Sequence, residues 1–217
     1  IRPEARRRHR EAIAALVQRD GLSGIVLDYQ GVPDDLQPAY VQFVRDLAAD
    51  LHARGADLVT TVRMPRRTGD GWDTGPISWP ELGAAADSLR ITLPAGEPID
   101  AEALDDLVRW SLRHVERGRL QLAVRAQGRD SVDGAVTPIS FGTALGHILD
   151  MARSDAPGQV APGTGQVIDL PTLEAAAFGW DESARLWRFK YWDDNRREHT
   201  IWLNDASGLS SVFEVAA

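Results

Sequence analysis

The sequence predicts an α/β fold with a parallel sheet, and three observations support this prediction. Short apolar runs alternate with amphipathic segments over most of the chain, which is the order expected where a helix crosses over between parallel strands. The apolar runs are nearly continuous, as in strands that are buried on both faces. The length of 217 residues, with 43% hydrophobic and 26% charged residues, fits one globular domain spanning residues 1–217.

The predicted elements follow from local signals. Apolar residues at helical spacing predict helices, and Asp20-Gly21, Gly55 and Gly118 end three of them. Ser78 and Glu81 have the spacing of a capping box. The predicted helices are residues 5–18, 36–55, a short one opened at 78–81, and 100–118. The predicted strands between them are residues 22–29, 57–64, 88–93 and 120–126.

The last third of the chain is less regular. Residues 131–165 show no clear period, and residues 156–165 form a Pro/Gly-rich loop. Residues 186–192 and 198–203 flank the polar segment 193–197, which predicts a β-hairpin. Trp180, Trp187 and Trp192 gather around this hairpin, where a role in a core or an interface is the simplest interpretation.

Charge and composition exclude several classes of function. The net charge of −8 disfavours a nucleic-acid partner, and the basic segment 6–10 has the character of a solvated helix face. The chain has no cysteine, and no apolar run approaches the roughly 20 residues of a membrane span. The five histidines lack metal-site spacing, so neither a metal nor a cofactor is expected. The chain begins at Ile1, and we interpret it as a piece of a longer protein.

The most informative motif is the segment Ser23-Gly24-Ile25-Val26-Leu27-Asp28-Tyr29-Gln30. It resembles the signature strand of the family 18 glycoside hydrolases, the chitinases and their relatives, which has the pattern Asp-Gly-x-Asp-x-Asp-x-Glu. Gly24 and Asp28 match this pattern. Ser23 and Val26 stand where the first two acids belong, and Gln30 takes the place of the catalytic Glu. Residues 26, 28 and 30 share one face of a strand, which the resemblance places inside a barrel.

Three further segments extend the resemblance. Tyr191-Trp192-Asp193, followed by 199–207 with Trp202, is similar to the family's closing hairpin, and Trp202 would be the floor of the central sugar subsite. Asp87 matches the start of the family's sixth strand, but Thr92, Pro94 and Ala95 stand where Met, Tyr and Asp would be. Residues 125–128 keep only the glycine of the Pro-x-Tyr-Gly pattern.

The resemblance implies a (β/α)8 TIM barrel of the family 18 type. A complete barrel usually takes about 250 residues. Five barrel strands can be assigned here, corresponding to strands four to eight with a C-terminal β-hairpin, so the upstream strands would be supplied by the missing part of the protein or by a partner. The resemblance also favours an extracellular or cell-envelope location.

The substitutions predict a catalytically impaired module. The family's mechanism relies on the substrate's own N-acetyl group and one protein proton donor, and an amide such as Gln30 has no acidic proton to give. We expect a pseudo-glycosidase that binds an N-acetylglucosamine-containing glycan, either chitin or peptidoglycan, without hydrolysing it. The expected glycan contacts are Asp28, Gln30, Trp72 and Trp202, with Val26, Asp28 and Gln30 as the degenerate catalytic positions.

Alternatives to this prediction remain open. Asp28 could be held by Gln30 or a backbone donor rather than by a ligand, and Trp72 could pack under its own loop. Asn204 and Asp205 fit the start of a helix near Ser207 better than a ligand site. The barrel could be a scaffold or a protein-interaction surface with no glycan bound. An active glycosidase would need a non-standard acid, for which residues 34–35 offer the nearby carboxyls.

Overall fold

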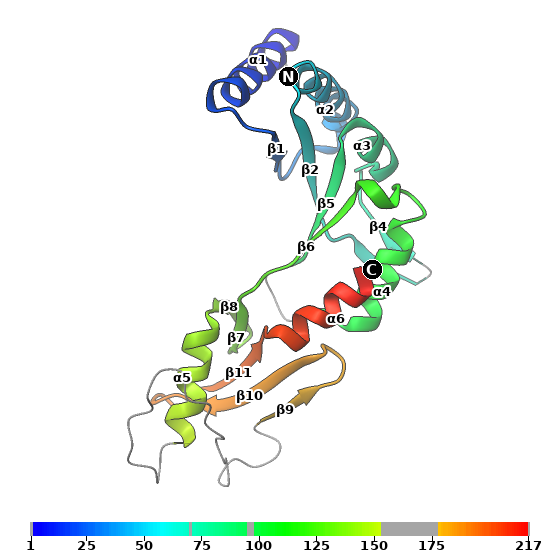
Figure 1. The fold of residues 1–217 in the computed structure, drawn as a ribbon. Helices are drawn as coiled ribbons and strands as arrows, with labels where there is room; N and C mark the ends of the chain where they lie inside the picture. Colours follow the sequence, from blue (N-terminus) through cyan, green and yellow to red (C-terminus); the bar gives the residue numbers. More distant parts are fainter. Residues whose placement is uncertain (1, 70, 95–97, 153–177, 217) are drawn as a thin grey trace. The chain divides into compact units, whose positions relative to one another are not determined.

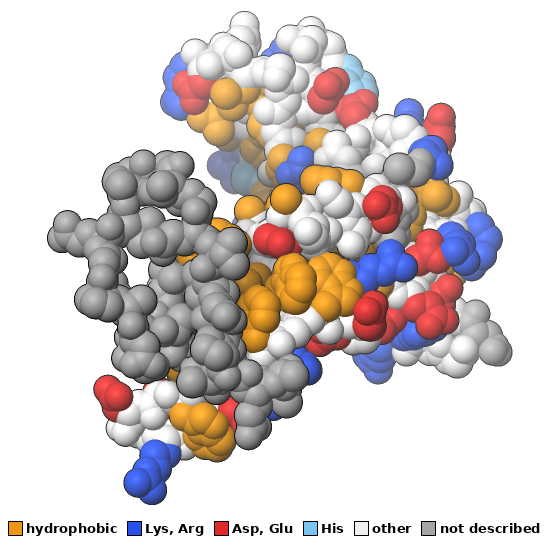
Figure 2. Space-filling view, turned by 60° about the horizontal axis from the view of Figure 1, so that its bottom comes forward, with side chains coloured by type: hydrophobic (Ala, Val, Ile, Leu, Met, Phe, Trp, Pro, Cys, Tyr) orange, Lys and Arg blue, Asp and Glu red, His pale blue; other side chains and the backbone are white. Residues whose placement is uncertain are grey.

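The computed structural model describes residues 2–69, 71–94, 98–152 and 178–216. The chain divides into two compact units, Ile1–Pro94 with Asp106–Ala123 and Ala95–Asp105 with Val124–Ala217. Each unit is described by itself below, and the single domain over residues 1–217 stays a prediction. No described helix has the length and apolar character to cross a membrane. On the face drawn in Figure 2, acidic and basic side chains lie interspersed between apolar ones.

The first unit contains the predicted parallel sheet. Its strands have the order β1-β2-β5-β6, and every neighbouring pair is parallel. The helices α2 and α3 pack on this sheet, and α1 packs on α2 (Figure 1). The strands are β1 (Gly24–Leu27), β2 (Asp57–Arg63), β5 (Ser88–Thr92) and β6 (Leu120–Ala123). The helices are α1 (Pro3–Asp20), α2 (Gln37–His52), α3 (Trp79–Ala85) and the part of α4 (Ala101–Ser111) from Asp106 on, with short 3-10 turns at Asp34–Leu36 and Arg117–Arg119. The residues of α4 up to Asp105 belong to the second unit.

The two faces of this sheet differ in character. Toward the helices it buries aliphatic side chains such as Leu58 and Leu89, both fully buried. Toward the other face it presents Val26, which is 46% exposed, and polar groups such as Thr61 and Arg90. Strand residues alternate between faces, so Val26 lies on the face away from the helices, and its expected place inside a barrel stays a prediction.

A small antiparallel hairpin follows β2, where the sequence predicts a glycine-rich loop. It consists of β3 (Arg66–Thr68) and β4 (Gly71–Asp73), and its cross-strand pairs are Arg66 with Asp73 and Arg67 with Trp72. The capping box that opens α3 is present in part, because Ser78 Oγ accepts the backbone N–H of Glu81 at 3.4 Å.

The second unit is built on an antiparallel sheet of five strands in the order β8-β7-β11-β10-β9. Apolar side chains of α5 and of three strands form its core, with Phe189 and Ile201 fully buried at the centre. The predicted hairpin is confirmed as the β10–β11 pair. The elements are β7 (Gly128–Val132), β8 (Ala135–Ile139), α5 (Phe141–Ala152), β9 (Phe178–Asp181), β10 (Leu186–Trp192), β11 (Glu198–Leu203) and α6 (Ala206–Ala216).

Two sequence predictions about the fold are wrong, and a third lies outside the described residues. The segment Glu198–Leu203, taken as the last parallel barrel strand, pairs antiparallel with β7 and β10. The described parallel sheet therefore has four strands rather than five. The helix that starts after Asp100 ends at Ser111, several residues before Gly118. The Pro/Gly-rich segment 156–165 lies outside the described residues, and a closed barrel stays a prediction.

Candidate functional site

A cleft of about 400 Å³ opens at the carboxyl ends of β1 and β2. In α/β proteins, ligands bind beyond the carboxyl ends of the parallel strands, because the loops there vary while the sheet holds them in place. The cleft wall combines the segment after β1, the end of β2, the β3–β4 hairpin and the start of α3. Its volume is within the range of small-ligand sites.

Four polar side chains form a continuous hydrogen-bonded chain at this cleft. The Thr61 hydroxyl and the Gln30 amide both donate to Asp28 Oδ1. Arg63 Nε donates to Gln30 Oε1 at 2.6 Å. Gln30, Thr61 and Arg63 line the cleft. The chain brings together two of the three degenerate positions that the resemblance identified, Asp28 and Gln30. Gln30 bonds Asp28, which was one of the alternatives left open from the sequence.

The electrostatics of this chain oppose proton donation. The Thr61 hydroxyl, then the Gln30 amide and the charge of Arg63, hold the pKa of Asp28 below its usual range. Asp28 therefore stays a carboxylate at neutral pH. Gln30 has an amide in place of an acid, and its carbonyl oxygen is taken by Arg63. At neutral pH neither side chain offers the proton of a carboxylic acid.

Two other carboxyls line the cleft, Asp34 and Asp73. Asp34 was among the candidates from sequence, whereas its exposed neighbour Asp35 does not line the cleft. Asp73, which the sequence reasoning missed, accepts the backbone N–H of Gly75 at 2.8 Å. Both carboxyls lie in loops or at strand ends outside the Thr61–Arg63 chain.

The sequence reasoning also missed Thr61 and Arg63. The alternation of residues along β2 could have identified them. Residues 59, 61 and 63 lie on one face of this strand, the same face as Asp28 and Gln30. Gln37 was also missed. Its side chain is buried, lines the cleft and donates to the Val32 carbonyl at 2.8 Å.

The two candidate tryptophans do not line this cleft. Trp72 lies on the β3–β4 hairpin and lines a second hollow, of about 330 Å³, together with Trp110 of α4. Trp202 belongs to the second unit, where β11 runs between β7 and β10 and is antiparallel to both. Its role as the floor of a sugar subsite stays a prediction. Its indole Nε1 donates to Asp181 Oδ2 at 3.3 Å.

The helix start after Trp202 agrees with the sequence prediction. Asp205 Oδ1 accepts the backbone N–H of Gly208 at 2.9 Å, which caps α6. Asn204 donates to the Arg125 carbonyl. Of the hairpin tryptophans, Trp187 packs against the core, while Trp192 is 65% exposed.

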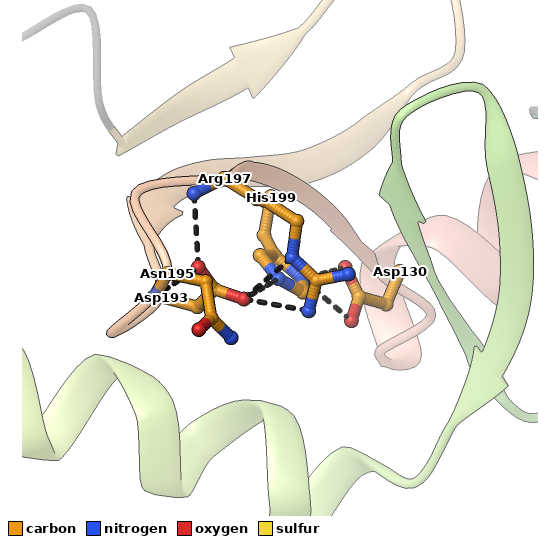
Figure 3. A network of polar contacts seen from close by, with 5 residues as sticks. All are labelled: Asp130, Asp193, Asn195, Arg197 and His199. Atoms are coloured by element: carbon orange, nitrogen blue, oxygen red, sulfur yellow. Dashed lines mark hydrogen bonds and ion pairs between the residues drawn. The ribbon is translucent and has the colours of Figure 1, made fainter.

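A second polar network lies in the antiparallel unit and links three segments of it (Figure 3). His199 of β11 is buried, and its Nδ1 lies 2.9 and 3.0 Å from the two carboxylate oxygens of Asp130 on β7. Its Nε2 is 3.5 Å from Asp193 Oδ2, longer than an ordinary hydrogen bond. Arg197 donates to the same Asp193 oxygen at 2.7 and 2.9 Å. The Tyr191 ring stacks on His199 with centroids 4.5 Å apart.

This network has the parts of a carboxylate–histidine dyad without access to a substrate. His199 Nε2 is buried and has no hydrogen-bond partner, so a molecule bound at the surface does not reach it. Within the described residues, no group of three or more His, Asp or Glu side chains is arranged to hold a metal. The network therefore fixes the β10–β11 turn against β7.

Low pH should weaken this network, and a substitution at Asp193 should reveal the loss of stability. The backbone N–H of Arg197, then its guanidinium group, hold the pKa of Asp193 well below its usual range. A carboxyl with a depressed folded-state pKa stabilises the fold above the unfolded-state pKa of about 3.9 and loses this contribution as the pH falls below it. We expect Asp193→Asn to lower the thermal midpoint at pH 7, with the difference from wild type shrinking below about pH 4.

The matched control is Asp194→Asn at the exposed neighbouring residue, which should leave the midpoint unchanged at both pH values. Circular dichroism melts across this pH range give the comparison. A wild-type–variant difference that stays constant as the pH falls would show that the Asp193 charge contributes nothing.

Comparison with solved structures places the fold. The chain is similar to a sporulation-specific glycosylase of Bacillus subtilis (ydhD), with a TM-score of 0.76 and 17% identity over 99% of this chain and 68% of the other. It is similar to a chitinase of Chromobacterium violaceum, with a TM-score of 0.74 and 19% identity over 96% of this chain and 62% of the other. The spore cortex-lytic enzyme SleL of Bacillus megaterium gives a TM-score of 0.77 and 15% identity over 99% of this chain and 47% of the other.

The predicted resemblance to chitinase-type glycoside hydrolases is thus confirmed at the level of the fold. The chain spans about half to two thirds of the length of these proteins. No family model and no curated protein matches the sequence.

Proposed function

We propose that this chain is part of a catalytically impaired, chitinase-type module that binds an N-acetylglucosamine-containing glycan, chitin or peptidoglycan, without hydrolysing it. The fold is shared with proteins described as a chitinase, a sporulation-specific glycosylase and a spore cortex-lytic enzyme, which supports a glycan as the ligand class. The observation that carries the proposal is the bonding of Gln30 to Asp28 and Arg63 at the position of the expected acid.

The cleft is equipped to bind but not to protonate. The Gln30 amide keeps one N–H beyond its bond to Asp28, and Arg63 keeps its terminal nitrogens beyond its bond to Gln30. These donors suit the carbonyl of an N-acetyl group and sugar hydroxyl oxygens. Asp34 and Asp73 supply acceptors for hydroxyl protons on the facing wall. General acid catalysis typically contributes about 10²- to 10⁴-fold, and its absence leaves only binding.

One observation favours a second candidate, a scaffold with no glycan ligand. The side chains of Thr61, Asp28, Gln30 and Arg63 already bond one another, so the site is held together without a ligand. A glycan would have to replace part of this bonding or add to it.

Calorimetric titration separates these candidates. With chitotetraose and a disaccharide muropeptide as probes, we expect saturable binding by the wild-type protein and no shorter product by chromatography. Gln30→Ala should weaken binding about tenfold, because it removes a donor and frees the Arg63 side chain. Trp202→Ala tests the predicted platform in the second unit, with Trp192→Ala at an exposed position as its control.

The outcomes are distinct. No heat with either probe at millimolar concentration would replace the glycan-binding proposal with the scaffold. Release of shorter oligosaccharides would overturn the assignment as a non-hydrolysing module. If that activity disappeared in Asp34→Asn or Asp73→Asn, the variant affected would identify the unexpected acid.

A further inference from the structure

We propose that the hollow between the β3–β4 hairpin and α4 is a second binding site, for a negatively charged sugar. It is separate from the cleft at the strand ends and shares no lining residue with it. The proposal goes beyond glycan binding at the cleft and does not depend on it.

The hairpin divides the two spaces. Cross-strand partners in a β-ribbon share a face. The pair Arg66 and Asp73 lines the cleft, whereas the pair Arg67 and Trp72 lines the hollow. One three-residue ribbon therefore presents a charged pair to one space and a guanidinium–indole pair to the other.

The opposite wall of the hollow comes from one side of α4 and the turn that follows it. Asp106, Arg109 and Trp110 are spaced by three and four residues, so they lie on one helix face, and Arg113 continues that row in the turn. Arg67 Nη2 bonds Asp106 Oδ2 at 2.7 Å, which fixes the hairpin against the helix. A Cβ at Gly71 would lie 3.7 Å from Trp110 Nε1, so the hairpin backbone and this indole are in close proximity.

The charge of the hollow selects an anion. Three arginines and one aspartate are its described charged lining residues, in a protein whose net charge is −8. Arg67 is paired with Asp106, and Arg109 has a partner of its own. The Arg113 backbone N–H donates to the Trp110 carbonyl at 3.1 Å, but its guanidinium group has no hydrogen bond or ion pair with another described residue and the residue is exposed. Guanidinium groups bind carboxylates and phosphates through parallel N–H donors.

The aromatic walls select a ring. Trp110 is held in place by Trp79, whose ring centroid is 5.4 Å away, and by His114 at 4.2 Å. A wall held in this way loses little conformational freedom when a ligand binds. Trp72, half-buried on the facing hairpin, adds a second indole. Indole faces beside guanidinium groups and a threonine suit a sugar ring that carries a carboxylate or a phosphate.

Titration with four small probes tests the class of ligand. Glucuronic acid and glucose 6-phosphate carry the two anionic groups, glucose carries neither, and sodium sulfate carries charge without a ring. At matched ionic strength we expect heat from at least one of the charged sugars at millimolar concentration, and none from glucose or sulfate. Binding should weaken as salt is added, because the hollow is open to solvent.

Three variants locate the site. Arg113→Gln and Trp72→Ala should each weaken binding about tenfold. Asp106→Asn removes the described carboxylate of the hollow and should tighten binding several-fold, a gain that misfolding cannot produce. Arg66→Gln, on the cleft face of the same ribbon, is the matched control and should change nothing.

The results that overturn the proposal are equally specific. If glucose bound with the same affinity as the charged sugars, the anionic group would not contribute to recognition. If sulfate bound with that affinity, the sugar ring would not contribute. Weakening by Arg66→Gln with no effect of Arg113→Gln would move the site to the cleft. Gln30→Ala marks binding at the cleft and Arg113→Gln marks binding at the hollow, so failure at one site is distinguishable from failure at the other.

Discussion

Gly128→Ala should destabilise the protein by about 3 kcal/mol or more. A Cβ at residue 128 would lie 2.6 Å from the Trp202 carbonyl oxygen and 3.3 Å from the Ile139 side chain. The Trp202 carbonyl belongs to the backbone of a paired strand, so rotation of a side chain cannot relieve this close contact. Relief requires β7 and β11 to move apart, which breaks their hydrogen bonds and displaces Asp130 from His199.

The measurement is urea unfolding followed by tryptophan fluorescence and by far-ultraviolet circular dichroism. Gly142→Ala makes the same chemical change near the start of α5, where no atom lies within 4 Å of the added methyl group. It should be neutral or stabilise by up to about 1 kcal/mol, because alanine favours helix over glycine. Equal unfolding midpoints for the two variants would show that the β7–β11 pairing has room that the structure does not indicate.

The same close approach explains which family-like positions this chain retains. Gly24 is one of the two matches in the signature strand, and a Cβ there would lie 2.7 Å from the Asp57 carbonyl oxygen of β2. Gly128 is the glycine kept from a second motif. At both glycines a side chain would meet backbone of the paired strand. Val26 instead is 46% exposed, and the Gln30 side chain bonds Asp28, so strand pairing does not fix the residue type at these two positions.

Local patterns predicted most of the first unit because its elements bury one clear face each. The apolar face of α2 and the aliphatic residues of β2 and β5 are buried where the helices cover the sheet. The fifth strand was mistaken for a different reason. Residues 198–203 alternate buried and less buried side chains, and alternation alone does not tell whether the neighbouring strand runs parallel or antiparallel. That depends on pairing with β7, which is distant in sequence.

The candidate site was predictable only along a single strand. The signature segment identified Asp28 and Gln30, but their partners Thr61 and Arg63 come from β2, and which of its residues face them depends on the register between strands. The two-sided hairpin had no clear signal, since three-residue strands separated by glycine and aspartate have the composition of a loop. The sequence therefore predicted Trp72 as a glycan contact, but it did not predict that α4 forms the opposite wall of its hollow.

The register between β1 and β2 leads to a second large effect: Gln30→Glu alone should not create a hydrolase. The carbonyl oxygen of Gln30 accepts from Arg63 Nε at 2.6 Å, and a carboxylate in its place would form a charge-assisted bond to the same guanidinium. An adjacent cation favours the ionised form of an acid, so the introduced carboxyl should have a pKa below the ordinary value of about 4.3 for glutamic acid. It would stay deprotonated at neutral pH and could not act as a general acid.

Removing the cation should change this. In the double variant Gln30→Glu/Arg63→Met the introduced carboxyl sits beside ionised Asp28 with no guanidinium to compensate, and a neighbouring negative charge raises the pKa of an acid. We expect carbon-13 NMR to place its pKa at least about one unit above that in Gln30→Glu. Turnover of a fluorogenic chitobioside by the full-length protein should then rise about 10²-fold over the single variant, the lower end of what general acid catalysis contributes.

Arg63→Met alone is the control and should be inactive. Activity in Gln30→Glu without the second change would mean that Arg63 does not govern this position, and the case for an impaired site would then rest on the amide of Gln30 by itself.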